Sequence, residues 1–360
     1  MPESRLFEPL SLSRGPAMKN RLVLAPITNQ QSYADGSLSL DEINWLAMRA
    51  AGGFGLIRTA AASVQHVGQG FLGQLGIYDD YHIAGLTKLA ATLRANGAIS
   101  AVQLYHGGDR ASPELVGKPV SPSDGSNNDA RALNIGEIER LREDFILAAL
   151  RSEKAGFDGV EVHGAHGYVL AQFLSPVINR RTDQYGGSLE NRARLLLDVI
   201  DGIRARCRSD FQIGLRLSPE RFGMKLDEVR DLATEIMRND KIDYLDMSLW
   251  DATKEPHDEA HRGQSLLSYF TEIPRGNVRL GVAGKITSAA DASGLIEAGC
   301  DFVTIGRAAI LCADFPKQVQ QNLFYEMSTM PVDEQELRNQ GANAQFVDYL
   351  RTFPGLVSAN

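Results

Sequence analysis

Cysteine is scarce in this chain of 360 residues, which contains only Cys207, Cys300 and Cys312. No two of them have the C-x-x-C spacing, and this excludes zinc ribbons, thioredoxin-type redox pairs and iron–sulfur clusters held by cysteine. An odd, sparse set of thiols predicts reduced, buried side chains in a reducing compartment. We therefore expect a cytoplasmic protein.

The chain also lacks long apolar runs and an excess of positive charge. No stretch reaches the ~18 apolar residues that a membrane helix needs, and residues 1–20 contain no apolar core of signal-peptide length. Lys and Arg number 37 against 45 Asp and Glu, a net charge of −8, whereas nucleic acids and anionic membranes bind basic surfaces. We expect neither as a partner. A hydrophobic content of 43% is typical of a globular domain and excludes a disordered chain.

Short β-rich segments alternate with longer segments of helical apolar spacing. Eight such segments occur, at residues 21–27, 55–60, 99–104, 159–163, 212–217, 244–248, 278–282 and 302–305. Helix starts are indicated by three capping pairs: Ser39 with Glu42, Asn134 with Glu137, and Ser288 with Asp291. Eight strand–helix units without a long linker predict one α/β domain, a closed (β/α)8 barrel of parallel strands.

One short pattern occurs twice. Residues 154–160 (KAGFDGV) resemble residues 297–303 (EAGCDFV), and each predicts a helix stopped by glycine before a strand that starts near an aspartate. Long polar loops are expected after the third strand (107–132) and after the sixth (251–265), and such loops are often functional.

We expect the barrel to span residues 1–325 and a C-terminal extension to span 326–360. Phe346, Tyr349, Leu350 and Phe353 have the spacing of a short helix. Its apolar face would cover either its own barrel or a neighbouring subunit. On the second interpretation we expect a homo-oligomer.

In a barrel of this kind, functional side chains follow the carboxyl ends of the strands. The segment His163-Gly-Ala-His166-Gly-Tyr168 follows the fourth strand. Three interpretations stand: metal ligands, histidines satisfied by loop backbone, or two imidazole donors aimed at an anionic oxygen with a phenol as proton donor. We favour the third, because two histidines three residues apart make a poor set of metal ligands.

Glycines follow the seventh and eighth strands, where many barrels bind phosphate. Gly284 and Gly306 allow backbone N–H groups to approach an anion, and Arg307 or Lys285 would add charge. The alternative is that both glycines are ordinary turn residues. Neither a dinucleotide-binding fingerprint nor a P-loop is present, so we expect a cofactor held in another way.

Three further residues are less specific. Arg216, on the fifth strand, is a buried cation that needs either a core carboxylate or a negatively charged cofactor. His257 and His261 lie in the polar loop after the sixth strand. We expect them to form a solvated loop or a substrate wall rather than a metal pair.

Four motifs in order resemble the Old Yellow Enzyme family of FMN-dependent, NAD(P)H-using ene-reductases. The motifs are residues 19–26 (KNRLVLAP), 163–168 (HGAHGY), 173–192 (FLSPVINRRTDQYGGSLENR) and 305–307 (IGR). The resemblance runs from about residue 6 to about residue 316. It implies a flavoprotein with FMN as cofactor and NADH or NADPH as reductant. Its substrates would be small electrophilic alkenes.

The resemblance also implies a role for each matching residue. Tyr168 would be the proton donor, and His163 and His166 would bind the substrate's carbonyl or nitro oxygen. Arg216 would lie against the flavin N1 and C2 carbonyl. The remaining flavin contacts would be Ala25, Pro26, Ile27, Thr28, Ala61 and Gln103 along the ring, with Gly284, Gly306 and Arg307 at the phosphate.

The chain also departs from the family pattern. Thr28 stands where one subgroup has a redox-tuning cysteine, Ile27 replaces the usual methionine, and Gln30 replaces a tyrosine. Two other functions are left open. One is a phosphosugar isomerase or aldolase that uses Lys285 for a Schiff base. The other is a flavin-binding protein without catalysis.

Overall fold

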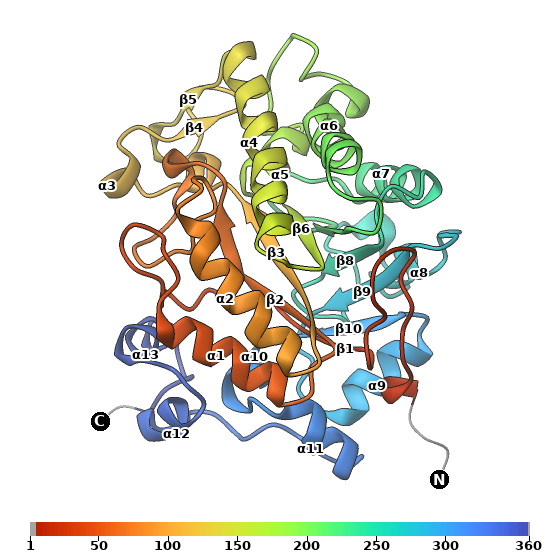
Figure 1. Ribbon diagram of the computed structural model, residues 1–360. Coiled ribbons are helices and arrows are strands. Elements are labelled where there is room, and N and C mark those ends of the chain that lie inside the picture. The colour runs from red at the N-terminus through yellow and green to blue at the C-terminus, as the bar shows by residue number, and fades with distance from the viewer. Residues whose placement is uncertain (1–4, 359–360) are drawn as a thin grey trace.

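Eight parallel strands close into a barrel in the computed structural model, which describes residues 5–358 (Figure 1). Around the barrel the strands are β1 (Leu22–Leu24), β10 (Phe302–Ile305), β9 (Arg279–Ala283), β8 (Tyr244–Ser248), β7 (Gln212–Leu217), β6 (Gly159–Gly164), β3 (Ile99–Tyr105) and β2 (Leu56–Ser63). The predicted (β/α)8 barrel is therefore confirmed, as are all eight strands.

Two strand ends differ from the prediction by three residues, each for a local reason, and the other differences are of one residue. β1 was expected to continue to Ile27, but Pro26 has no N–H to donate, and Ala25 makes the last ladder bond, to Ile305. β2 continues past Ala60, because its register shifts and Ala61 pairs with Gln103.

Helices surround the barrel. The longer ones are α1 (Leu40–Ala51), α2 (His82–Ala95), α4 (Ile135–Lys154), α6 (Leu189–Arg206), α7 (Leu226–Arg238) and α9 (Ala289–Glu297). The three predicted caps are present: Ser39 accepts a hydrogen bond from the Glu42 backbone, and Asn134–Glu137 and Ser288–Asp291 are full capping boxes.

The repeated glycine–aspartate pattern has the same structure in both places. Gly156 and Gly299 have φ of +91° and +106°, which favours glycine. Asp158 then accepts a bond from the Ser100 backbone N–H at 2.8 Å, and Asp301 accepts one from Leu280 at 2.9 Å. Each aspartate thus ties the start of its strand to the neighbouring strand.

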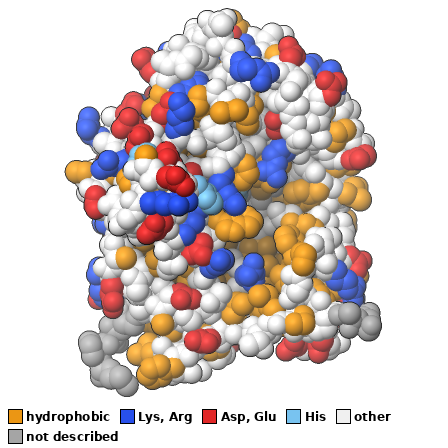
Figure 2. Space-filling model, turned by 180° about the vertical axis from the view of Figure 1, so that it is seen from behind, with side chains coloured by type: hydrophobic (Ala, Val, Ile, Leu, Met, Phe, Trp, Pro, Cys, Tyr) orange, Lys and Arg blue, Asp and Glu red, His pale blue; other side chains and the backbone are white. Residues whose placement is uncertain are grey.

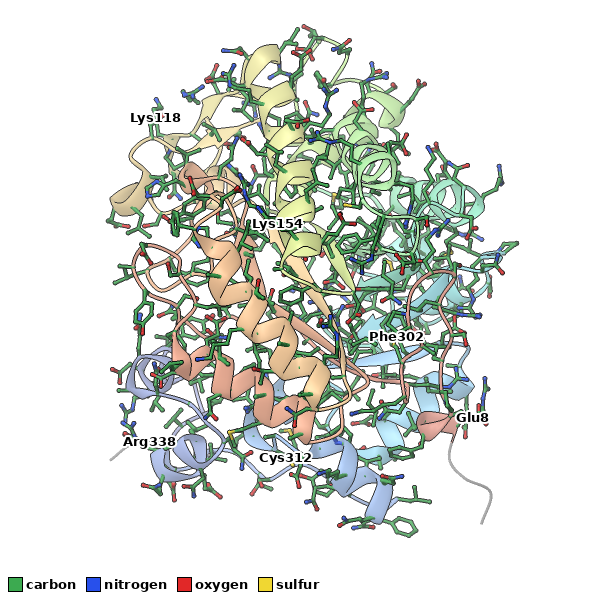
Figure 3. The ribbon with its side chains drawn as sticks, in the orientation of Figure 1. Glu8, Lys118, Lys154, Phe302, Cys312 and Arg338 are labelled. Carbon is green, nitrogen blue, oxygen red and sulfur yellow. The ribbon has the colours of Figure 1, made fainter. Side chains whose placement is uncertain are left out.

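The amino ends of the strands are closed by packing. The ring of Phe302, labelled in Figure 3, meets Tyr244 edge-to-face at 5.6 Å. A Cβ at Gly214 or Gly281 would lie 2.1 Å from Tyr244 or 2.0 Å from Phe302, so glycine makes room for both rings. With this end filled, the carboxyl ends of the strands are left for a site.

The two long loops carry some structure of their own. The loop after β3 contains α3 (Pro113–Val116) and a two-stranded parallel pair, β4 (Val120–Ser121) and β5 (Arg131–Ala132). The loop after β8 contains one 3-10 turn, Glu259–His261, and is followed by α8 (Ser268–Thr271). Two shorter helices follow β10, namely α10 (Arg307–Leu311) and α11 (Phe315–Gln321), and α5 (Val169–Leu174) follows β6.

All three cysteines are free, but only Cys300 is buried. The expectation of buried thiols is wrong for Cys207 and Cys312, which are half-buried because they lie just beyond the ends of α6 and α10. Burial raises the pKa of Cys300 to about 12. In the part of the chain that the structure describes, no helix is long and apolar enough to cross a bilayer.

The C-terminal extension packs on the barrel of its own chain, beside α1 (Figure 1). It contains α12 (Glu334–Asn339) and α13 (Ala344–Arg351), and Phe346 meets Trp45 edge-to-face at 5.8 Å. Arg49 is fully buried and donates to the backbone oxygens of Trp45, Gln340, Ala309 and Ile310. Phe353 lies beyond the helix end and is 44% exposed. The expected contact with a neighbouring subunit stays a prediction.

Candidate active site

The structure brings His163, His166 and Tyr168 together where β6 ends. The two imidazole rings are 5.0 Å apart, and the Tyr168 ring lies 5.4 Å from His163 and 6.4 Å from His166 (centroid distances). His166 has a φ of +61°, uncommon for a residue other than glycine, and the loop turns there. Such backbone strain is frequent at functional sites.

Both histidines are neutral at neutral pH. Burial, together with the nearby Arg216 and Arg110, lowers the pKa of His166 to about 3. Burial, His166 and Arg216 hold the pKa of His163 well below its usual value. Each neutral imidazole has one N–H to donate.

The ring nitrogens differ in their partners. His166 Nε2 lies 2.7 Å from the Ser248 hydroxyl. His163 Nδ1 is buried and has no hydrogen-bond partner among the described residues, so a ligand oxygen would satisfy it. Over the same residues, no group of three His, Cys, Asp or Glu side chains could hold a metal ion.

Three side chains that the sequence reasoning did not select surround Tyr168. The Tyr105 ring meets it edge-to-face at 4.5 Å, and the Arg110 guanidinium lies 4.9 Å from its centroid. Arg110 also donates to the His166 backbone oxygen. The third is Tyr349 from α13, whose pKa is raised by burial and by Tyr168 and lowered by a hydrogen bond with the Thr28 side chain. The sequence signal for Tyr349 was its helical spacing, which predicted a helix and not a site.

A cavity of about 340 Å³ opens at the carboxyl ends of β7, β8, β9 and β10, and Figure 2 shows a hollow with hydrophobic and basic side chains around it. Its lining includes Ala25, Arg216, Gly284, Gly306 and Arg307, all of them predicted flavin contacts. At Gly284 a Cβ would lie 2.7 Å from the Ala252 backbone nitrogen, so the loop after β8 approaches closely only because residue 284 is glycine.

The lining fits an anionic group. At Gly306 an added Cβ would meet only Ala25, at 3.8 Å, so the backbone there faces open space. Arg307 is exposed and forms no ion pair within residues 5–358. Arg216 Nε is buried without a hydrogen-bond partner in that same range. The Arg216 guanidinium, which is paired with Asp246 at 3.5 Å, and the exposed Arg307 guanidinium therefore line a space bounded by glycine backbone, which suits an anion with a phosphate.

The other predicted flavin contacts lie next to this cavity or near the histidines. Pro26, Ile27 and Thr28 form the segment that leaves β1, and all three are half-buried. Ala61 and Gln103 are buried partners in the β2–β3 ladder. The Gln103 amide donates to Glu161 at 2.7 Å. Arg216 was expected to face either a core carboxylate or a negatively charged cofactor. The structure supplies the first, Asp246 at 3.5 Å, and leaves room for the second.

The surroundings of three other candidate residues do not favour a catalytic role. The Lys285 side chain is 59% exposed and forms an ion pair with Asp251 at 2.9 Å, unlike the desolvated lysine of a Schiff-base enzyme. His257 is mostly exposed and lies 3.6 Å from Glu220, and His261 lies 2.9 Å from Asp227. The hydrogen bond with Asp227 raises the pKa of His261.

The sequence profile of the NADH:flavin oxidoreductase / NADH oxidase family matches residues 5–326. The chain is 36% identical over 337 residues to the probable NADH-dependent flavin oxidoreductase YqiG of Bacillus subtilis, which covers 90% of both chains. It is 34% identical over 328 residues to the NADPH dehydrogenase of Halalkalibacterium halodurans, covering 89% of this chain and 95% of the relative.

Two solved structures share the fold. The old yellow enzyme homologue from Zymomonas mobilis superposes with a TM-score of 0.79 at 27% identity, over 92% of this chain and 96% of that one. Morphinone reductase in complex with tetrahydroNAD superposes with a TM-score of 0.78 at 28% identity, over 96% of both chains.

Proposed function

The chain belongs to the NADH:flavin oxidoreductase / NADH oxidase family, and from that premise we propose that it is an FMN-dependent ene-reductase. It would use NADH or NADPH to reduce carbon–carbon double bonds activated by a carbonyl or nitro group. The single observation that carries this proposal is the arrangement of His163, His166 and Tyr168 beside a cavity that suits an anionic cofactor.

FMN would be held by the residues around that cavity. Gly284, Gly306 and Arg307 would bind its phosphate, and Arg216 would face the N1 and C2 carbonyl edge. Ala25, Pro26, Ile27, Thr28, Ala61 and Gln103 would contact the ring. The fit rests on the two guanidiniums that line the cavity, Arg216 and Arg307, and on the open space in front of the Gly306 backbone. When bound, FMN supplies a two-electron carrier that accepts a hydride from the nicotinamide and passes one to the alkene.

The chain's own residues would supply the polar part of the reaction. The N–H groups of the neutral His163 and His166 donate to the substrate's carbonyl or nitro oxygen. They stabilise the negative charge that develops on that oxygen, and being already in place they need no reorganisation. The Tyr168 hydroxyl then gives its proton to the α-carbon. Arg110 lies over the Tyr168 ring and Tyr105 meets it edge-to-face, and both hold that ring in position.

The nicotinamide would enter the same pocket. The chain has no dinucleotide-binding fingerprint, so the dinucleotide needs another place to bind. The morphinone reductase complex with tetrahydroNAD, on the same fold, supports nicotinamide binding in a barrel of this kind. The relatives include both an NADH-dependent and an NADPH-dependent enzyme, so we propose both reductants for testing.

The test is an anaerobic titration of the purified yellow protein with NADH and then with NADPH, followed in the visible spectrum. Bleaching, then recovery of colour with 2-cyclohexenone, maleimide or a nitroalkene, is the expected result. A protein that takes up no FMN, or that either reductant fails to bleach, would contradict the proposal. If the flavin is bleached but no alkene restores its colour, the protein is an NAD(P)H oxidoreductase and the ene-reductase proposal is rejected.

A further inference from the structure

Four charged side chains meet inside the barrel beneath the cavity. They come from four strands: Arg58 on β2, Glu161 on β6, Arg216 on β7 and Asp246 on β8. Arg58 Nη1 lies 2.6 Å from Asp246 Oδ2 and also contacts Glu161. The same Asp246 oxygen lies 3.5 Å from Arg216 Nε. Asp246 therefore bridges two guanidiniums, one within the core and one at the cavity.

The four formal charges cancel. The side chains of Arg58, Glu161 and Asp246 have no exposed surface, and that of Arg216 is 7% exposed. Burial by itself would raise the pKa of Asp246, but Arg58 and Arg216 hold it below its usual value. Asp246 is thus a carboxylate, and its charge opposes that of Arg216 at close range, where little water screens it.

The positions of these groups are fixed by further bonds. Arg58 Nη2 donates to the Thr304 hydroxyl at 2.7 Å, and that hydroxyl donates to Asp246 Oδ1 at 3.2 Å. Arg58 Nε donates to the Leu24 backbone oxygen at 3.1 Å. A buried network with this many partners has little freedom to move. The charge behind Arg216 is therefore a permanent feature of the barrel.

We propose that Asp246 is a positioning residue that sets the midpoint potential of bound FMN through Arg216, with Arg58 as the counter-charge that keeps Asp246 in place. This inference rests on the proposed function. Reduction of a flavin adds negative charge at its N1 and C2 carbonyl edge, and Arg216 is the cation proposed for that edge. Because Asp246 already neutralises part of the Arg216 charge, it makes the reduced cofactor less stable than Arg216 alone would.

The Asp246 charge should therefore have opposite effects on the rates of the two half-reactions. A cofactor of lower potential is harder to reduce with NAD(P)H but a stronger reductant toward the alkene. Removing the Asp246 charge should therefore speed reduction of the flavin and slow its reoxidation by alkene. A residue that only stabilised the fold would leave the potential where it was.

The experiment compares three variants by the midpoint potential of bound FMN, measured in an anaerobic dye-coupled titration. The cluster carries a net charge of zero in the natural chain. It carries +1 in Asp246→Asn, −1 in Arg58→Met and zero in the double variant. The potential is expected to rise in Asp246→Asn, to fall in Arg58→Met and to return close to the natural value when both changes are combined.

Asp243→Asn is the matched control. Asp243 immediately precedes β8, at the amino end of the strand that carries Asp246. Like Asp246, it is fully buried, and it pairs with Arg204 at 3.0 Å. The midpoint potential of FMN bound to Asp243→Asn should match that of FMN bound to the natural protein. Where Asp246→Asn does not fold, Arg58→Met and the neutral double variant still test the inference. The midpoint potential should fall in Arg58→Met and match the natural value in the double variant.

Two results would overturn the inference. One is a potential in Asp246→Asn that equals or lies below the natural value. The other is a set of potentials that does not follow the charge of the cluster. A protein that takes up no FMN removes the proposed function, and this inference with it. If FMN binds and is bleached normally but the midpoint potentials do not follow the charge of the cluster, the proposed function stands and only this inference is rejected.

Discussion

The Thr28 side chain lies close enough to Tyr349 to lower the pKa of that tyrosine, which places the C-terminal helix α13 beside the segment that leaves β1. A second contact supports the same docking, since the Asn343 backbone N–H donates to the Gln31 side chain at 2.9 Å. Tyr168 is close enough to raise the pKa of Tyr349. The C-terminal extension therefore forms part of the wall around the proposed proton donor.

Replacing Tyr349 should change which alkenes the pocket accepts. Tyr349→Ala removes the ring and makes space, so kcat/KM for a bulky substituted cyclohexenone should rise about tenfold relative to 2-cyclohexenone, within the range that one pocket contact provides. Tyr349→Phe keeps the ring and serves as the control. An unchanged ratio in Tyr349→Ala would place the ring outside the substrate's reach.

Tyr168→Phe should slow the oxidative half-reaction and spare reduction of the flavin. The loss of a positioned proton donor commonly costs 10²- to 10⁴-fold, and the nicotinamide step requires no proton from a phenol. Stopped-flow absorbance at the flavin band measures each half-reaction separately. Tyr185→Phe, a change in another buried tyrosine, which packs on Phe173, is the control. Equal rates in Tyr168→Phe and the natural protein would reject the proton-donor role.

Arg307→Met should weaken binding of FMN and leave binding of riboflavin unchanged. The two flavins differ by the phosphate, and a hydrogen bond to a charged group contributes about 1.5–3 kcal/mol, or roughly 10- to 100-fold in Kd. Quenching of flavin fluorescence gives both constants. Equal weakening of the two flavins would mean that Arg307 supports the fold and does not contact phosphate.

Because His106 is buried, the free energy of unfolding should decrease as the pH falls below about 6.5. Burial lowers its pKa to about 3, whereas in the unfolded chain it is ~6.5. Between these values the unfolded state binds a proton that the folded state excludes, so the free energy of unfolding decreases as the pH falls. At pH 5.5 this contribution has cost about 1.4 kcal/mol.

Denaturant unfolding at pH 7.5 and pH 5.5 measures that contribution. In His106→Asn the difference between the two pH values should be smaller by about 1.4 kcal/mol than in the natural protein. The exposed His66, replaced by Asn, is the control. The same pH difference in His106→Asn and in the natural protein would show that His106 titrates alike in both states.

The strands and caps can be predicted from the sequence because their signals are local. Asn134 and Glu137 are three residues apart, and their capping box forms within one helical turn. His163, His166 and Tyr168 share one loop, so their proximity also follows from the chain. Pro26 shows the limit of pattern reading, because its missing N–H ends β1 earlier than the apolar run does.

Contacts between strands that are distant in the sequence cannot be predicted from local sequence patterns. In the sequence, Arg58 is an isolated charge in the apolar strand 56–63, and Asp246 is an isolated charge in the middle of the strand 244–248. Their pairing at 2.6 Å depends on the barrel's register, which no local pattern encodes. Tyr349 was predictable as a helical residue, but its position beside Thr28 depends on where the extension docks.

The buried Arg49 couples the C-terminal extension to the rest of the molecule. Its guanidinium donates to the backbone oxygen of Gln340, and also to those of Ala309 and Ile310 in α10. Detachment of the extension alone would leave part of a buried cation without acceptors, at a cost that discourages partial opening. Amide protons of α12 should accordingly exchange with deuterium through the same cooperative event as those of α1, and calorimetry should record one endotherm for barrel and extension together.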